Sequence, residues 1–271
     1  MPSKVSSRKR KAAPEWATAP FEHFIAEAER LTHVARLSSI GISMIQARPK
    51  IIEVLMKIRE DDSIDESQRL KTAREDADLS KREVESGFPI LHAWAVVGLW
   101  ALLEATNRKF LTEWLTHKRT AWRIEPIQRL KIRLGEYESM PKNHRYSFVV
   151  ALLERDLAAS LKGGVSRFEA MLQPFGLSGE IPGRLEREMF EFSQVRNLIA
   201  HNAGKVDQRF VKACPWLKVR VGDDFLVSGK MLAKYCAASI YYITLVICRV
   251  GESFAIDMSK ERLSIMQSFE K

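Results

Sequence analysis

The sequence is poor in cysteine, since only Cys214, Cys236 and Cys248 occur among 271 residues. Their number is odd and no C-x-x-C pair is present, so neither a disulfide framework nor a zinc site of that type is expected. The histidines show no H-E-x-x-H spacing, and Gly163-Gly164 lacks the Lys-Ser/Thr that completes a phosphate loop. The sequence therefore predicts no cofactor, no metal and a reducing cytoplasm.

The last apolar segment is short for a membrane span. The longest uncharged stretch of the last apolar segment, from Tyr235 to Cys248, has only 14 residues, whereas a membrane span needs about 20. Residues 1–14 carry positive charges with no apolar stretch after them, so they are not typical of a signal peptide. We therefore expect a cytoplasmic protein with no membrane partner.

Positive charge is concentrated at the start of the chain. The net charge is +9, and five lysines and arginines precede the first acidic residue; the remaining 38 basic residues nearly balance 34 acidic ones. Residues 1–19 are predicted to form a basic, disordered tail. Such a tail could contact RNA phosphates or could simply be solvated, and the charge pattern alone does not choose between the two.

Helical periodicity dominates the rest of the chain. Residues 20–86 are predicted to form an N-terminal helical extension, interrupted at Gly41 and Pro49, whose charged part, 60–86, is either a solvated helix or a hinge. Helices are further predicted, before the loop 175–183, at 89–116, 122–140, 146–161 and 165–174. A small β-hairpin over 217–227 and a buried helix over 231–250 follow. The fold class is therefore an all-α bundle with one small hairpin.

One polar motif interrupts an apolar helix near residue 200. Leu185, Met189, Phe192, Val195 and Ile199 recur at helical spacing, and the sequence then reads RNLIAHNAG from Arg196 to Gly204. Asn197 and His201 are four residues apart and share a face, whereas Arg196 lies about 140° from His201 around an ideal helix. A guanidinium, an imidazole and an amide together suit phosphate chemistry.

This motif resembles that of the HEPN superfamily, in which an Arg precedes a His by four to six residues, often as Arg-Asn-x-x-x-His. The resemblance covers residues 87–271 and implies a metal-independent endoribonuclease, active as a homodimer whose two motifs line one cleft. It implies that His201 is a general acid or base, that Arg196 stabilises the transition state, and that Asn197 orients one of them. The competing interpretation is a core helix capped by Gly204, with cations at its solvated end.

An acidic residue near the motif is also part of the resemblance, and Glu104 is the candidate. It shares a helix face with Trp100 and Asn107, so it is expected to be partly buried and to need a partner. That partner is either Arg196, which Glu104 would then position, or Arg108, four residues along the same helix.

The biological setting is open to several interpretations. The resemblance suggests a toxin of a toxin–antitoxin pair or an antiviral defence effector that acts on RNA, with an antitoxin or another inhibitory protein as a partner. Some HEPN toxins carry a Tyr two residues after the His, where a partner enzyme modifies it, but this sequence has Ala203. The alternatives are a non-catalytic HEPN module for dimerisation or RNA binding, and an unrelated helical scaffold.

Overall fold

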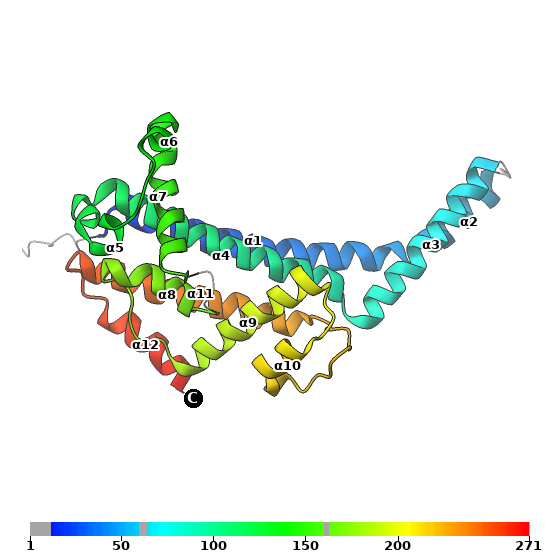
Figure 1. Ribbon diagram of the computed structural model, residues 1–271. Coiled ribbons are helices and arrows are strands. Elements are labelled where there is room, and N and C mark those ends of the chain that lie inside the picture. Colours follow the sequence, from blue (N-terminus) through cyan, green and yellow to red (C-terminus); the bar gives the residue numbers. More distant parts are fainter. Residues whose placement is uncertain (1–11, 60–63, 160–162, 271) are drawn as a thin grey trace, which may run out of the picture. The chain divides into compact units, whose positions relative to one another are not determined.

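The computed structural model describes residues 12–59, 64–159 and 163–270, and it is built from helices. The predicted tail lies largely outside the described residues, since residues 1–11 are not among them. Figure 1 shows the helices in chain order. They are α1 Glu15–Ile45, α2 Arg48–Arg59, α3 Ile64–Ser86, α4 Pro89–His117, α5 Glu125–Gln128, α6 Leu134–Ser139, α7 Lys142–Asp156, α8 Ser166–Leu172, α9 Gly183–Asn202, α10 Gln208–Ala213, α11 Gly229–Ser253 and α12 Ser259–Glu270. Short 3₁₀ turns, η1 Arg119–Arg123, η3 Gln173–Phe175 and η4 Pro215–Leu217, join some of them.

The helices belong to two compact units. One unit comprises residues 1–25, 103–190 and 238–271, and the other comprises 26–102 and 191–237. The division passes through α1, α4, α9 and α11, so each of these long helices contributes to both units. The all-α class predicted from the sequence is thus confirmed for the described residues.

The core of the first unit is aromatic. The rings of Phe21 and Phe110 lie 4.7 Å apart, and Trp114 contacts Trp16 and Phe254 edge-to-face. Burial of aromatic rings removes a large apolar area from water, and edge-to-face pairs add a favourable electrostatic term. These contacts explain why α1 begins at Glu15, five residues earlier than predicted: Trp16 is needed in the core.

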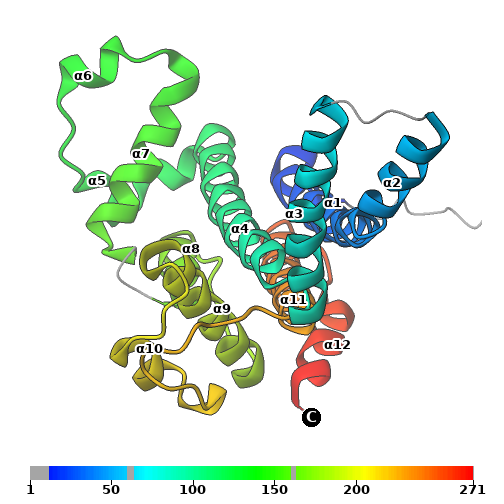
Figure 2. The ribbon, with the colours of Figure 1, turned by 90° about the vertical axis from the view of Figure 1, so that its right-hand side faces the viewer.

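The core of the second unit is built around one end of α9. The ring of Phe192 stacks on Tyr235 at 5.0 Å and meets Trp100 edge-to-face at 5.0 Å. α2 and α3 run side by side as a helical hairpin (Figures 1 and 2). Two ion pairs join them, Arg48 to Asp76 at 3.0 Å and Arg74 to Glu53 at 2.7 Å. The charged stretch predicted as a helix or a hinge is therefore helical from Ile64 to Ser86.

Glycine and proline acted differently in the N-terminal helices. The break predicted at Gly41 is wrong, because α1 continues through it to Ile45. A glycine inside a helix costs only about 1 kcal/mol, which a long helix tolerates. The break predicted at Pro49 is confirmed. α1 ends at Ile45 and α2 begins at Arg48, so Pro49 lies in the first turn of α2, where the missing N–H is not required.

The helix predicted over 122–140 is wrong. The structure has η1, α5 and α6 there, and residues 130–133, between α5 and α6, are not helical. Pro126 lies in the first turn of α5, which suits the start of a new helix and not the middle of an old one. Helices α10 and α12 were also not predicted from the sequence.

The hairpin predicted for 217–227 is not confirmed. Within residues 205–227, all of which are described, one isolated antiparallel bridge joins Lys205 to Asp224. The segment pairs instead with the residues that follow α9: Phe225 N–H donates to the Gly204 carbonyl at 2.9 Å and Val206 N–H to that of Asp223 at 3.0 Å. The Asp223 carboxylate accepts the Arg220 N–H at 2.9 Å, which closes a turn where a strand was expected.

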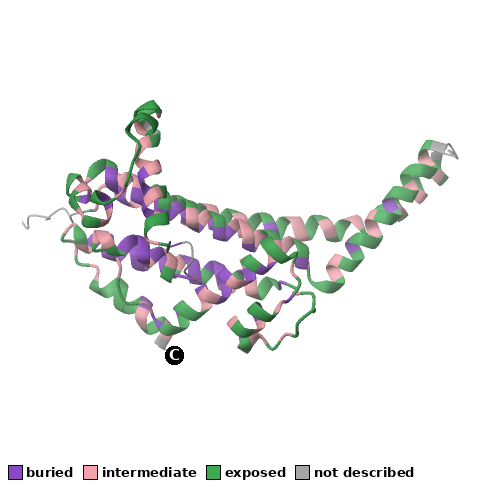
Figure 3. Ribbon diagram, in the orientation of Figure 1, coloured by how far each residue is buried: buried purple, intermediate pink, exposed green. Residues whose placement is uncertain are grey.

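Two helices, α4 and α11, are long and apolar enough to cross a bilayer. Their most apolar windows are 33% and 56% buried, respectively, and length and composition alone do not separate a membrane span from a core helix. Figure 3 shows that buried residues recur along α11, whereas α2 and α6 are mostly exposed.

Candidate functional site

The motif lies in the last two turns of α9, on a helix with a fully buried apolar stripe. Leu185, Met189, Phe192 and Val195 are inaccessible to solvent, and Ile199 is half-buried. This stripe fixes the rotation of α9 about its own axis. Positions 197 and 201 are consequently turned outwards, and both Asn197 and His201 are exposed.

Arg196 is half-buried, and its guanidinium reaches its neighbour in the sequence. Its Nη1 donates a hydrogen bond to Asn197 Oδ1 at 3.0 Å. The guanidinium of Arg196 and the amide of Asn197 thus lie side by side, and Asn197 shares its helix face with His201. A cation, an amide and an imidazole are therefore presented from adjacent turns of one helix end.

The turn that follows His201 is held by several hydrogen bonds. Ala203 and Gly204 both have positive φ, 49° and 77°, and the Gly204 N–H donates to the Leu198 carbonyl at 3.2 Å. Asn202 Nδ2 donates to the Lys205 carbonyl at 2.9 Å, and the Lys205 N–H donates back to the Asn202 carbonyl at the same distance. The predicted closure of the helix by Gly204 is confirmed, and His201 lies on a fixed helix end.

Glu104 lies in a largely buried ion cluster. Its Oε1 accepts from Arg167 Nη1 at 2.5 Å, and Arg167 Nη2 reaches Glu154 at 2.7 Å. Arg108 donates from Nε to the same Glu154 at 2.9 Å and not to Glu104. Arg167 lies 63 residues from Glu104, and no sequence pattern predicted it as a partner. Glu104 and Arg196 belong to different units, so their predicted pairing stays a prediction.

The electrostatics of this cluster favour its ionised form. Burial raises the pKa of the Glu154 carboxyl, but hydrogen bonds from Arg108 and Arg167 outweigh burial and hold that pKa below its usual value. The pKa of Arg108 is raised, chiefly by its hydrogen bond to Glu154. The space between these side chains is small, about 10 Å³, which is too little for a substrate. The cluster is therefore suited to hold α4, α7 and α8 together.

Glu191 is a second buried carboxylate that the sequence analysis missed. It lies five residues before Arg196 and accepts hydrogen bonds from Trp216 Nε1 at 2.6 Å, from Tyr235 Oη at 2.8 Å and from Lys234 Nζ. These donors come from η4 and α11, so the carboxylate ties both elements to the motif end of α9. The only available signal was a Glu between two phenylalanines, which is too weak to identify a buried acid.

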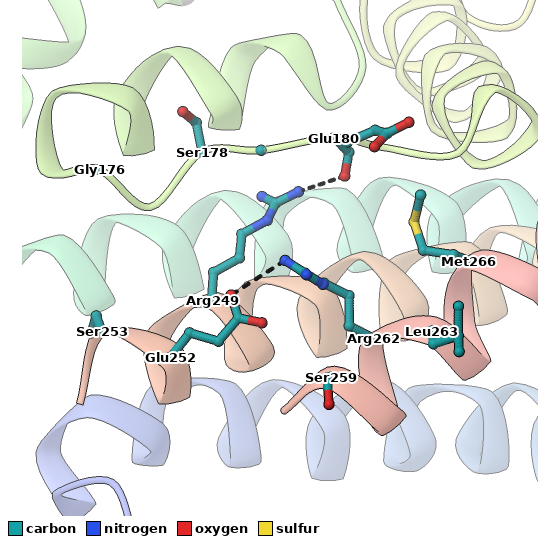
Figure 4. Close-up of a pocket in the computed structure, with 11 residues that line it drawn as sticks. Gly176, Ser178, Glu180, Arg249, Glu252, Ser253, Ser259, Arg262, Leu263 and Met266 are labelled. Atoms are coloured by element: carbon teal, nitrogen blue, oxygen red, sulfur yellow. Dashed lines mark hydrogen bonds and ion pairs between the residues drawn. The ribbon is translucent and has the colours of Figure 1, made fainter. Parts of the chain in front are cut away.

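The first unit also contains an open groove of about 710 Å³ between the loop 176–180, the end of α11 and α12 (Figure 4). Arg249 donates there to Glu169 at 2.8 Å and to the Glu180 carbonyl at 2.9 Å, and Arg262 pairs with Glu252 at 3.4 Å. Burial and the charge of Glu169 raise the pKa of the Tyr242 hydroxyl well above its usual value, so this hydroxyl stays protonated and donates to Glu169. Because acids balance the two arginines, the groove is a weaker phosphate site than the exposed motif.

No group of three or more His, Cys, Asp and Glu side chains that could hold a metal ion occurs in the described part of the chain. Its three cysteines are free thiols and all are buried. No family model, curated protein or solved structure matches this chain.

Proposed function

We propose that this chain is an HEPN-like, metal-independent endoribonuclease of the cytoplasm. The observation that supports this best is the exposure of Asn197 and His201 on one face of the fixed end of α9, with the Arg196 guanidinium bonded to Asn197. The resemblance adds a homodimer whose two motifs line a shared cleft, and a role as a toxin or defence effector that an inhibitory protein controls. Residues 87–271 would form the HEPN-like domain.

RNA carries its own nucleophile, the 2′-hydroxyl, so the protein has to supply proton transfer and charge stabilisation. In this mechanism His201 removes the 2′-hydroxyl proton or donates a proton to the departing 5′-oxygen. The planar guanidinium of Arg196 stabilises the additional negative charge on the phosphorus centre in the transition state. Asn197 holds the guanidinium or a phosphate oxygen, and Glu104 is proposed to position Arg196.

The test is cleavage of RNA in the presence of EDTA. Cleavage should leave a 2′,3′-cyclic or 3′-phosphate end, and DNA or RNA with a 2′-O-methyl group at the cut site should resist. His201→Ala should lower the rate by about 10²–10⁴-fold with an unchanged melting temperature, because the exposed ring contributes little packing. His23→Ala, which removes another exposed histidine, is the matched control. A wild-type rate in His201→Ala would refute the catalytic role.

Arg196→Lys separates charge from geometry. A lysine keeps the positive charge but loses the planar fork that can span two phosphate oxygens, so the rate should still fall. Arg209→Lys, on the exposed surface of α10, is the control.

The second candidate function is a non-catalytic RNA-binding or dimerisation module. It is favoured by the same exposed cationic helix end, which requires no chemistry to bind a phosphate. Under this alternative, RNA binds with a steep salt dependence but stays intact, and His201→Ala changes only affinity.

A further inference from the structure

An unpartnered apolar face runs along the second half of α1 and along α2. Among the described residues, 17 large apolar residues are exposed, and eight of them lie between Val34 and Ile58. Met44 and Ile58 are 73% and 72% exposed. Six of these eight residues form three pairs that are symmetric in the sequence: Leu37, Ile40, Met44, Ile51, Leu55 and Ile58.

The spacing of this face is symmetric about the peptide bond between Ala47 and Arg48. Met44 and Ile51 are equally far from that bond, as are Ile40 and Leu55, and likewise Leu37 and Ile58. Two copies that pack antiparallel about this point would place each of these residues against an apolar residue of the other copy. A two-fold interface needs this self-complementarity.

The helical path supports one continuous face. Although a turn separates α1 from α2, Ala47 N–H donates to the Met44 carbonyl and Ile51 N–H to the Ala47 carbonyl, both at 3.2 Å. On an uninterrupted helix, residues seven apart lie close in rotation about the axis, and these two bonds bridge the turn between Met44 and Ile51.

Gly41 fits the same symmetry. A Cβ atom at Gly41 would meet nothing within 4 Å, so packing within the chain does not require a glycine there. Its counterpart across the symmetry point is Val54, which is exposed. A glycine opposite a valine allows two helices to approach closely.

The exposed area is large enough for a stable pair. The exposed fractions of the eight residues together equal more than four whole residues, on the order of 800 Å², which is what one partner contributes to a standard interface. Soluble monomers rarely leave so large an apolar patch open. A lipid surface is a poorer partner, because α2 and α3 together carry nine basic and eight acidic residues and so offer little net charge to attract an anionic membrane.

We propose that the α1–α2 face, residues 34–58, is a self-association surface on which a second copy of this chain packs antiparallel. The α2–α3 ion pairs of Arg48 and Glu53 hold α2 against α3 for this contact. The inference does not depend on the proposed function, because it uses no residue of the motif.

The first test is the mass in solution, measured by light scattering and sedimentation on the full chain at about 50 µM. The wild type should have at least twice the 31.0 kDa of one chain, and four times that mass if the proposed dimer at the motif forms as well. Met44→Glu with Ile51→Glu should weaken the dimer by about 100-fold or more, because four buried charges would meet at the seam. Leu134→Glu, on an equally exposed residue of α6, is the control and should leave the mass unchanged.

The second test is the register. A mixture of Met44→Cys and Ile51→Cys proteins should form disulfide-linked pairs. Each variant alone should not, because like positions would be about 10 Å apart along the helix, beyond disulfide reach. The native thiols are buried and should not interfere.

Three results would overturn the inference. The first is a wild-type monomer at this concentration, and the second is Met44→Cys crosslinking to itself. The third is a mass that the double Glu substitution leaves unchanged, because another surface would then hold the copies together, and the proposed nuclease would be unaffected. Monomeric wild type that sediments with neutral vesicles, but not after the Glu substitutions, would instead identify the face as a lipid contact.

Discussion

Replacement of Arg167 by Met should destabilise the protein more than removal of any single surface charge. Arg167, Glu104 and Glu154 are only 16%, 14% and 13% exposed, so the guanidinium neutralises two carboxylates that water reaches poorly. Loss of one member of a buried ion cluster costs about 3–5 kcal/mol. For a chain of this size that corresponds to a fall in melting temperature of roughly 6–20 °C.

The control is Arg129→Met, which breaks a 2.7 Å ion pair with Asp156 in which Arg129 is 48% exposed. Exposed pairs contribute about 0–1 kcal/mol. The triple variant Glu104→Gln, Glu154→Gln and Arg167→Met should recover most of the lost stability, because it removes the buried guanidinium together with both carboxylates. Arg108 loses its partner Glu154 in this variant, but its side chain is 53% exposed. Thermal unfolding followed by circular dichroism measures all three proteins. Equal melting temperatures for Arg167→Met and Arg129→Met would refute this reasoning.

The same cluster predicts a dependence on pH. Because the pKa of Glu154 is lowered in the folded protein, its contribution to the free energy of unfolding is present above the unfolded pKa of about 4.3. It is lost as the pH falls through the lower folded value. The stability difference between wild type and Arg167→Met should therefore narrow below about pH 4. A difference that stays constant from pH 7 to pH 3 would contradict this assignment.

Three smaller perturbations follow. In a urea titration, Gly164→Ala should destabilise the protein by about 1–3 kcal/mol, because φ is +58° there and an added Cβ would lie 2.8 Å from the Phe190 Cα. The control Gly176→Ala has a similar φ of +69° but open space around the added Cβ, so it should lower the free energy of unfolding less. Asp207→Ala should cost about 1 kcal/mol in that assay, because its Oδ1 caps α10 by accepting the Phe210 N–H at 2.7 Å, and no loss would show that the cap is dispensable. Deletion of residues 1–13 removes five lysines and arginines, so it should weaken RNA binding and flatten its salt dependence in a filter-binding assay. A loss of the helical circular dichroism signal would instead indicate that these residues have a structural role.

Strong periodicity made the long apolar helices predictable. α4 and α9 begin and end near the predicted residues because their buried stripes repeat every three to four positions. Local rules failed where two effects compete. Gly41 did not stop α1, and Pro126 did stop a basic helix. Residues 217–227 bond to Gly204 and Val206, just after α9, through long-range backbone hydrogen bonds that no local pattern predicts.

The candidate site was also predicted only in part. The shared face of Asn197 and His201 follows from their spacing alone, and the structure places both in solvent. The partners of the buried acids do not follow from any spacing. Arg167 is 63 residues from Glu104, and Tyr235 is 44 residues from Glu191. Only the tertiary fold brings such pairs together, so the periodicity of the sequence does not predict them.

The three buried thiols can be used as native probes of local unfolding, because each reacts only when its part of the structure opens. Burial raises the pKa of the Cys236 and Cys248 thiols, so little thiolate is present at neutral pH and reaction with an alkylating reagent has to await exposure of the sulfur. Cys214 and Cys236 belong to one compact unit and Cys248 to the other. The labelling rates of Cys236 and Cys248, both on α11, therefore time the opening of each unit separately on a single continuous helix.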